Sequence, residues 1–541
     1  MKGIAFLPGF IASLLTWGIL PASAQVTSDN TTNTTVNQNG NNFNILNGIQ
    51  KGSNLFHSFK EFSIPKGSSV TFQNSSAIEN IINRVTGGNI SNIDGLIKTN
   101  GNANLFLINP NGIIFGENAK LDIGGSFLGS TAESILFKNG FKFSAVNYQN
   151  KPLLTISVPV GLQIGKKPGK IEVNGNGHNL IPATQISPLK RSRNNSNLNI
   201  SRKTLALVGG EIKLNGGIVT TASGNIELVA LGEGLVKFDI NNQELTLNYA
   251  GLSNFEDIQF LQKSLVAATG KNAGSIQVQG ANININDGSK IWIQNRGLQQ
   301  SGNININADE YLIVSGNTSD DNITSGLTIE TLAQGNSGDI NIFGRKLLVE
   351  NGARISNNTY SSGTSGDINL KLLDSVKIFG LSPIDKRSSV INTSTLRVGN
   401  SGAVNLSTTE LTILNGGIIS SSTLGSGNAG YVTINAADNI EAIGISPLLQ
   451  QSTISSFSTG TGNAGNLIVN TKKLVTKDGG RVDSSTFFSG AAGSVTINAS
   501  ESVEVSGQAK GSRNPSLIIS SANILDEVIR KRFGLPEKPF G

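Results

Sequence analysis

The chain lacks cysteine and has little histidine, tryptophan or methionine. Of its 541 residues, two are histidine, two are tryptophan and one is methionine. The absence of cysteine excludes disulfides, thiolate metal sites and a cysteine nucleophile. His57 and His178 are too few for a histidine-rich metal centre, so we predict no metal and no cofactor. No Walker-type phosphate loop occurs, and we predict no nucleotide partner.

Charged and aromatic residues are also scarce, at 14% and 6% of the chain, and the formal net charge is +6. So small a charge on so long a chain excludes a disordered polyelectrolyte. It is also too dilute to indicate a nucleic-acid partner. Glycine is abundant, at 64 positions, together with asparagine, serine and threonine. Because these residues are poor helix formers, the composition predicts an extended β architecture with many turns.

The first 24 residues have the pattern of a secretory signal. An apolar stretch from Ile4 to Leu20 precedes Ala22-Ser23-Ala24, which has the small-residue form of a cleavage site. We predict cleavage between Ala24 and Gln25. An uncleaved membrane anchor is the alternative, but the apolar stretch is short for a span.

A short motif recurs eight times from residue 272 onwards: a small or polar residue, glycine, any residue, an aliphatic residue, any residue and a second aliphatic residue. Its glycines are Gly274, Gly302, Gly338, Gly366, Gly402, Gly430, Gly465 and Gly493. Their successive spacings are 28, 36, 28, 36, 28, 35 and 28 residues. The alternation indicates two kinds of unit and a true repeat of about 64 residues over residues 271–520.

The two aliphatic positions of each copy are separated by one residue, which is typical of a strand with one buried face. Strands this short cannot each form a core, but stacked strands share one, as in a solenoid. We therefore predict an all-β fold, a right-handed parallel β-helix. With three coils for each repeat and about 4.8 Å between strands, it would extend on the order of 100 Å. A β-propeller is the alternative, but unequal units are unsuited to a closed ring.

Two flanking segments depart from this repeat. Residues 166–270 are predicted to contain a basic loop insertion and irregular coils, and residues 521–541 a short helix that covers the open end of the solenoid. The basic side chains of the first segment are Lys166, Lys167, Lys170, Lys190, Arg191, Arg193, Arg202 and Lys203. They form either a solvated loop or a surface that holds an anionic polysaccharide by charge.

Residues 25–165 form a separate N-terminal module. Two apolar stretches, Leu105–Ile108 and Ile113–Phe115, are predicted strands joined by Asn109-Pro110-Asn111-Gly112, whose residue types suit the successive positions of a tight turn. Other landmarks precede and follow this turn. They are Asn54-Leu55-Phe56-His57-Ser58-Phe59, Phe62-Ser63-Ile64-Pro65, Asn80-Ile81-Ile82-Asn83-Arg84-Val85 and Gly125-Ser126-Phe127.

In the linked order of these motifs, the module resembles the N-terminal secretion domain of the filamentous haemagglutinin family, the exported proteins of two-partner secretion systems. The resemblance implies that Asn109, Pro110, Asn111, Gly112 and Ile113 are the second of two signature asparagine motifs and take part in recognition by the transporter. The first motif has no intact match, and Asn74-Ser75-Ser76 lies at the place expected for it.

The resemblance also implies export through a dedicated outer-membrane β-barrel transporter with periplasmic docking domains. We accordingly expect a secreted or cell-surface protein, associated with the outer membrane of a Gram-negative-type bacterium. Its expected function is that of an adhesin that binds cells, matrix or glycans. The alternatives are a β-helical polysaccharide-active enzyme and the stalk of a contact-dependent toxin.

An enzyme would need clustered carboxylates on one face of neighbouring coils. Asp339 and Asp367 occupy equivalent positions in adjacent copies, but the other copies have Ser, Asn, Ala or Tyr there. This variation is typical of a solvent-facing position. We therefore predict no catalytic residue and no enzymatic activity.

Overall fold

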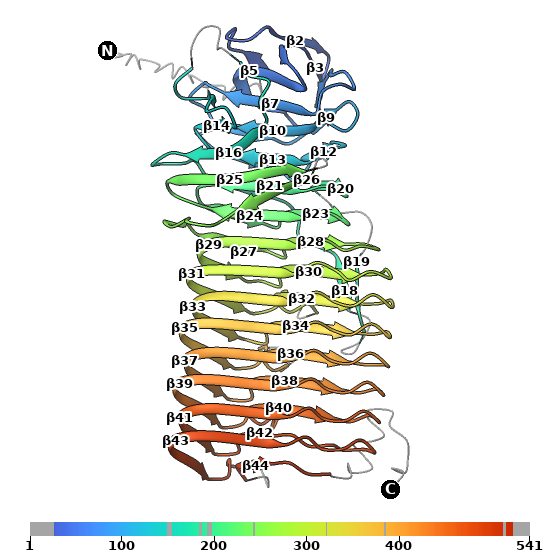
Figure 1. Cartoon of the computed structure of the whole chain (residues 1–541), viewed down its shortest axis with the longest axis vertical. Coiled ribbons are helices and arrows are strands. Elements are labelled where there is room, and N and C mark those ends of the chain that lie inside the picture. The colour runs from blue at the N-terminus through green and yellow to red at the C-terminus, as the bar shows by residue number, and fades with distance from the viewer. Residues whose placement is uncertain are drawn as a thin grey trace, which may run out of the picture.

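A computed structural model of the chain describes residues 26–148, 154–182, 187–191, 197–241, 244–320, 322–383, 386–511 and 515–522. The predicted signal segment with its Ala24–Gln25 cleavage site lies outside these residues, as does nearly all of the predicted C-terminal helix. Every regular element of the described residues is a β-strand. The strands are stacked into one long column of coils (Figure 1), which confirms the predicted parallel β-helix.

Each coil of the N-terminal part has strands on three faces. The first face contains β5 (Asn54–Phe62), β7 (Asn80–Val85), β10 (Asn104–Ile108), β13 (Phe127–Ser130), β21 (Leu205–Gly209) and β24 (Ile226–Ala230). The second contains β8 (Ser91–Ile93), β11 (Ile113–Phe115), β17 (Ile171–Asn174), β22 (Ile212–Asn215) and β27 (Ile258–Leu261). Neighbours within each face pair in parallel.

The first two faces merge at β29 (Ile276–Ile285), because its first half pairs with β24 and its second half with β27. From there each coil has one long strand that carries a register shift near its middle. These strands are β31 (Ile304–Ser315), β33 (Ile340–Glu350), β35 (Ile368–Phe379), β37 (Val404–Leu414), β39 (Val432–Ile443), β41 (Leu467–Lys477) and β43 (Val495–Ser506).

The third face consists of two sheets that follow one another along the column. The N-terminal sheet contains β2 (Thr34–Asn39), β3 (Asn42–Asn47), β6 (Ser69–Phe72), β9 (Leu96–Thr99) and β12 (Lys120–Asp122). The long sheet contains β20 (Leu198–Ser201), β23 (Ile218–Ala222), β28 (Leu265–Thr269), β30 (Lys290–Asn295), β32 (Gly326–Thr331), β34 (Arg354–Thr359), β36 (Val390–Thr395), β38 (Ile418–Thr423), β40 (Thr453–Ser458), β42 (Arg481–Asp483) and β44 (Leu517–Ile519).

Each copy of the glycine motif begins one coil. A repeat of 28 and 36 residues therefore makes two coils, not the three assumed in the estimate of the length. In the shorter coils the chain turns between faces at a pair such as Asn351-Gly352, with φ of 54° and 81°. The longer coils insert a loop at this point, closed in one case by an antiparallel bridge between Leu381 and Ser388. The spacing between motif glycines does not distinguish an inserted loop from additional strands, so it did not reveal the number of coils in each repeat.

The motif glycines stack directly on one another. A Cβ atom on Gly402 would lie 2.1 Å from the carbonyl oxygen of Gly366, and one on Gly430 equally close to that of Gly402. Only glycine permits coils to approach so closely at this corner. The aliphatic positions that follow each glycine point inward and form one interior that continues from Val26 to Val482.

A second core lies outside the coils of the N-terminal part. An antiparallel sheet covers the outer surface of the first face (Figure 1). Its strands are β14 (Ser134–Phe137), β15 (Lys142–Ser144), β16 (Pro159–Ile164), β25 (Gly234–Asn241) and β26 (Glu244–Asn248). Because β10 is buried on both surfaces, Leu105–Ile108 reads as a continuous apolar run.

Two antiparallel additions complete the fold. β1 (Val26–Ser28) and β4 (Ile49–Lys51) pair with β5 at the N-terminal end of the column. The hairpin of β18 (Leu180–Pro182) and β19 (Leu189–Arg191) leaves the column within the predicted basic insertion. Apolar side chains of this hairpin pack on the long third-face sheet, with Trp292 and Ile323 among their contacts.

Candidate functional site

The predicted recognition motif forms a corner of the column. β10 ends at Ile108 and β11 begins at Ile113, as the sequence predicted. Asn109–Gly112 turns the chain from the first face to the second, and the backbone N–H of Gly112 donates to the carbonyl of Asn109 at 3.1 Å. The structure therefore brings all five motif residues together at one position of one coil.

Asn109 is fully buried, and its side chain joins two coils. Its Nδ2 donates to the carbonyl of Asn89 at 3.0 Å and to Ser91 Oγ at 2.9 Å, both in the preceding coil. Its Oδ1 accepts from the backbone N–H of Asn111 at 3.0 Å, which fixes the turn. Since the amide is used within the coil stack, Asn109 supports the corner and presents no surface to a partner.

Pro110 and Asn111 are the accessible part of the corner, half-buried and exposed respectively. Asn111 Nδ2 donates to the carbonyl of Gly87 at 2.9 Å. Gly112 has φ of 128°, in the region that favours glycine, and a Cβ there would lie 3.1 Å from the carbonyl oxygen of Lys170 in the next coil. The exposed part of the corner is thus polar, and hydrogen bonds and close backbone packing tie it to the neighbouring coils.

The segment at the place of the missing first motif is also a coil corner. Asn74 Nδ2 donates to the carbonyl of Asn100 at 2.8 Å, and its Oδ1 accepts from the Asn100 backbone N–H at 2.9 Å. This pair links two consecutive coils, as Asn109 links to Ser91. A structural role is therefore established for Asn74 without any intact motif around it.

Both histidines are buried. His57 packs against Phe59 and Phe72, and burial lowers its pKa to about 3. His178 accepts from the N–H of Leu180 at 3.3 Å through Nδ1 and binds the carbonyl of Gly288 at 2.9 Å through Nε2. It thereby fastens the start of the hairpin to the column. His57 Nδ1 lies 3.0 Å from Thr34 Oγ1, a buried contact within the N-terminal end of the column.

Asp339 and Asp367 have structural roles. The Asp339 carboxylate accepts from the backbone N–H of Asp367 at 2.8 Å, and that of Asp367 from the N–H of Ala403 at 2.7 Å. Each carboxylate thus caps the following coil. Both side chains are partly exposed, and the equivalent Tyr431 is exposed, in agreement with a solvent-facing position. Of the predicted basic cluster, Lys170 is bound to Glu211, with Nζ 2.7 Å from Oε2.

A groove of about 380 Å³ lies on the outer surface of the long third-face sheet. Three rows of outward side chains run along this surface, and small ones on β34, β36 and β38 create the hollow. These are Ser356, Ser394, Ser420 and Ser422. Larger residues bound it: Leu189 and Glu330 toward the hairpin, and Phe457 of β40 at the far end.

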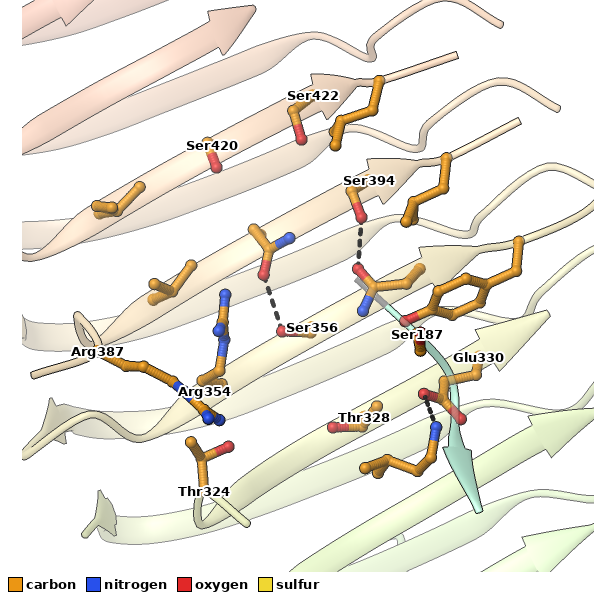
Figure 2. A pocket seen from close by; sticks show the side chains of 18 of the residues that line it. Ser187, Thr324, Thr328, Glu330, Arg354, Ser356, Arg387, Ser394, Ser420 and Ser422 are labelled. Atoms are coloured by element: carbon orange, nitrogen blue, oxygen red, sulfur yellow. Dashed lines mark hydrogen bonds between the residues drawn. The ribbon is translucent and has the colours of Figure 1, made fainter. Parts of the chain in front are cut away.

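Figure 2 shows the arrangement of the polar groups. Arg354 and Arg387 enter the groove from one side, whereas Glu330 and Ser187 lie toward the other. Ser356 donates to Asn392 Oδ1 at 2.8 Å, and Ser394 to Asn358 Oδ1 at 2.7 Å. The floor is thus built from hydroxyls and amides that project from consecutive coils.

Glu330 holds the hairpin in place. Its carboxylate accepts from the N–H of Leu189 at 2.9 Å, from Gln294 Nε2 at 2.8 Å and from Trp292 Nε1 at 3.1 Å. Burial raises its pKa, and burial likewise lowers the pKa of nearby Lys290 to about 7. Glu330 is the one carboxylate among the groove residues that the structure describes, so the carboxylate pair of a glycoside hydrolase is not assembled there.

The sequence indicated neither the groove nor its residues. Glu330, Arg354 and Ser420 occupy outward positions of strands whose inward residues carry the aliphatic pattern. Their spacing along the chain carries no signal of its own, because they meet only when the coils are stacked in register. Within the described residues there is no group of three or more histidine and carboxylate side chains placed to hold a metal. These residues also contain no helix long and apolar enough to span a membrane.

Comparison with known proteins gives three findings. Residues 24–278 match the family model for the TPS secretion domain, the two-partner secretion domain. A segment of 79 residues is 35% identical to the heme/hemopexin-binding protein of Haemophilus influenzae, and it makes up 15% of this chain and 8% of that protein. The crystal structure of the HMW1 secretion domain from Haemophilus influenzae shares 18% identity over 93% of this chain and 99% of its own, with a TM-score of 0.32.

Proposed function

From the premise that this chain is a two-partner secretion exoprotein, whose secretion domain lies within residues 24–278, we propose that it acts as an adhesin. The family match agrees with the resemblance to the filamentous haemagglutinin family, and it extends beyond residue 165. Exoproteins of this class are secreted by Gram-negative bacteria with an outer-membrane transporter as partner. The finer proposal is that the exported column stays at the cell surface and binds cells, matrix or glycans.

The observation that carries the proposal is the continuity of the column. The coils of the secretion domain run without interruption into the repeat coils, since β24 and β27 both pair with β29. Residues beyond the secretion domain therefore extend its faces into a long, regular surface (Figure 1). Coil-on-coil contacts are local in sequence, so folding can propagate as the chain emerges from a transporter.

We further propose that the corner formed by Asn109–Ile113 is contacted by the transporter. The exposed side chain of Asn111 would provide the contact, and the buried side chain of Asn109 would hold the corner in shape. Asn118 offers a matched control. It also makes hydrogen bonds to the preceding coil, to Asp94, but lies outside the motif.

The test is secretion of full-length variants from cells that also produce the transporter. Asn111→Ala is expected to slow secretion several-fold with unchanged synthesis, whereas Asn118→Ala is expected to be secreted at the normal rate. Equal secretion of both would reduce the motif to an ordinary turn. For the adhesin proposal, cells that export the chain should attach to host cells, matrix or glycan-coated surfaces more than cells without it, and equal attachment would refute it.

A further inference from the structure

The corner of the predicted recognition motif grips the preceding coil on both sides of one residue, Ile90. Asn109 Nδ2 donates to the carbonyl of Asn89 at 3.0 Å and to Ser91 Oγ at 2.9 Å. The backbone N–H of Ser91 donates in return to the carbonyl of Gly112 at 3.1 Å. Because Asn89 and Ser91 are the chain neighbours of Ile90, these hydrogen bonds fix the position of Ile90 relative to the motif.

The segment that carries Ile90 is also fixed from its other side. Asn89 Nδ2 donates to Glu61 Oε1 at 2.7 Å, and the backbone N–H of Gly87 donates to the carbonyl of Lys60 at 3.0 Å. A Cβ atom on Gly87 would lie 2.1 Å from that same carbonyl oxygen, so the two coils touch through their backbones. Ile90 therefore belongs to a segment that is held between two coils.

Ile90 is nevertheless open to solvent, with 42% of its surface exposed. Its side chain lies beside Gly112, since a Cβ atom built there would be 3.5 Å from Ile90 Cγ1 and 3.6 Å from Cγ2. Glycine has no side chain, so the motif leaves Ile90 uncovered at this point. Ile114, the outward and half-buried residue of β11, lies diagonally across and extends the apolar surface.

The surroundings of this small apolar surface are polar. Asn111 is exposed, and the next two coils place Lys170 and Glu211 in register with Gly112, with Nζ 2.7 Å from Oε2. Protein interfaces commonly have an apolar centre within a polar rim, and a few anchor side chains provide most of the binding energy. Ile90 and its surroundings have this arrangement.

The buried part of the motif can act on a partner only through an exposed residue that it positions. Asn109 is fully buried, and its amide donates to the residues on either side of Ile90. Single exposed aliphatic side chains are common on protein surfaces, so exposure alone gives Ile90 no role. Ile90 is distinguished by the motif that holds it.

We propose that Ile90 is the apolar contact between the secretion domain and the outer-membrane transporter, and that Asn109 is the positioning residue that holds it in place. Ile90 enters an apolar pocket of the transporter's periplasmic docking domain, with Asn111 at the rim of the contact. This inference rests on the proposed contact between the corner and the transporter, and it names the residue that supplies the apolar part of that contact.

The test is the rate at which full-length variants leave cells that also produce the transporter. Ile90→Ala is expected to slow secretion about ten-fold with unchanged synthesis, because an anchor side chain is removed. Ile90→Leu keeps the apolar volume and is expected to stay within about two-fold of the wild-type rate. Secretion of Ile90→Ala at the wild-type rate would overturn the proposal.

Ile156 provides the matched control. It is 74% exposed, and Asn54 Nδ2 donates to the carbonyls of both its neighbours, at 3.4 Å and 2.8 Å. Ile156 is thus an exposed isoleucine whose segment is held by an asparagine outside the motif. Ile156→Ala is expected to be secreted at the normal rate, and slowing equal to that of Ile90→Ala would contradict a specific role for Ile90.

A second measurement detects the contact directly. A photoreactive residue is incorporated at position 90 or position 156 of the full-length chain, and crosslinks to the transporter are expected from position 90 alone. In Asn109→Ala the crosslink from position 90 should weaken, because the neighbours of Ile90 are released. An unchanged crosslink would remove the positioning role from Asn109, and no crosslink from position 90 in the otherwise wild-type chain would overturn the contact.

The variants also separate this inference from the contact proposed for Asn111. If Asn111→Ala slows secretion and Ile90→Ala does not, the transporter contacts the corner but Ile90 is not its apolar anchor. If Ile90→Ala slows secretion and Asn111→Ala does not, Ile90 is the contact and the role proposed for Asn111 fails. Normal secretion of both variants would refute both proposals.

Discussion

One row of outward side chains shows how the two parts of the column differ. The row follows the first face from coil to coil in unbroken register. Its members, in order, are Phe106, Leu128, Ala206, Glu227, Gln277, Asn305, Asn341, Asn369 and Asn405. The row is apolar from Phe106 to Ala206, changes to polar at Glu227 and Gln277, and is a ladder of asparagines from Asn305 to Asn405.

The change coincides with the end of the outer sheet. Phe106 is covered by that sheet and lies 5.9 Å from the ring centre of Phe238 in β25. From Asn305 to Asn405 no described strand covers the row. The amides of Asn341, Asn369 and Asn405 each donate to the asparagine of the preceding coil, as Asn369 does to Asn341 Oδ1 at 2.9 Å. The same backbone position thus serves a two-layer region, which is stabilised by a second core, and a one-layer region, which depends on stacking between coils.

The largest loss of stability in the one-layer region is expected from a substitution in the stack of motif glycines. In Gly402→Ala the new Cβ would lie 2.1 Å from the carbonyl oxygen of Gly366, so the coils must separate. We expect a loss of about 5 kcal/mol in the free energy of unfolding, at the upper end of single substitutions. Urea unfolding followed by circular dichroism measures it. Gly88→Ala is the control, because a Cβ there has nothing within 4 Å; equal losses would contradict the stacking argument.

In the two-layer region the corresponding substitution is Phe106→Ala. Phe106 is 1% exposed, and its removal leaves a cavity between the first face and the outer sheet. Loss of a buried phenylalanine side chain costs about 4 kcal/mol. The midpoint of urea unfolding should fall accordingly. A loss below about 1 kcal/mol would show that the outer sheet contributes little to the stability of the secretion domain.

The sequence predicted the inward side of both regions better than the outward side. Alternating residues such as Ile276 and Val278 identified the coils, because burial on one surface imposes a period of two. The turn at Asn109–Gly112 was evident from residue types whose backbone preferences are local. The outer sheet was missed, since β14–β16 and β25–β26 are far apart in sequence. The groove was missed because its residues meet only across coils.

Glu227 occupies the boundary of the two regions in the same row, and Tyr249 donates a hydrogen bond to it. Burial raises the pKa of Glu227 from 4.5 to about 7. The folded state therefore holds this proton more tightly than the unfolded state, and the stability it contributes is present below pH 4.5 and lost as the pH rises through 7. The loss is of order 3 kcal/mol. Glu227→Gln should abolish this part of the pH dependence. Thermal unfolding of the wild-type chain and the variant at pH 5 and pH 8 measures it. An equal change in stability between the two pH values in both proteins would show that Glu227 is ionised when buried.

The smallest effect is expected on the asparagine ladder itself. Asn369→Ala removes the bond to Asn341 and the one that Asn405 donates to Asn369 Oδ1 at 3.0 Å. The ladder is partly open to solvent, and water replaces much of what is lost, so the cost should be about 1 kcal/mol. Urea unfolding measures the loss of stability in Asn369→Ala and in Phe106→Ala. The two values compare positions of the same row without and with an outer layer. A loss as large as that of Phe106→Ala would mean that the ladder, more than the inner core, holds the repeat coils in register.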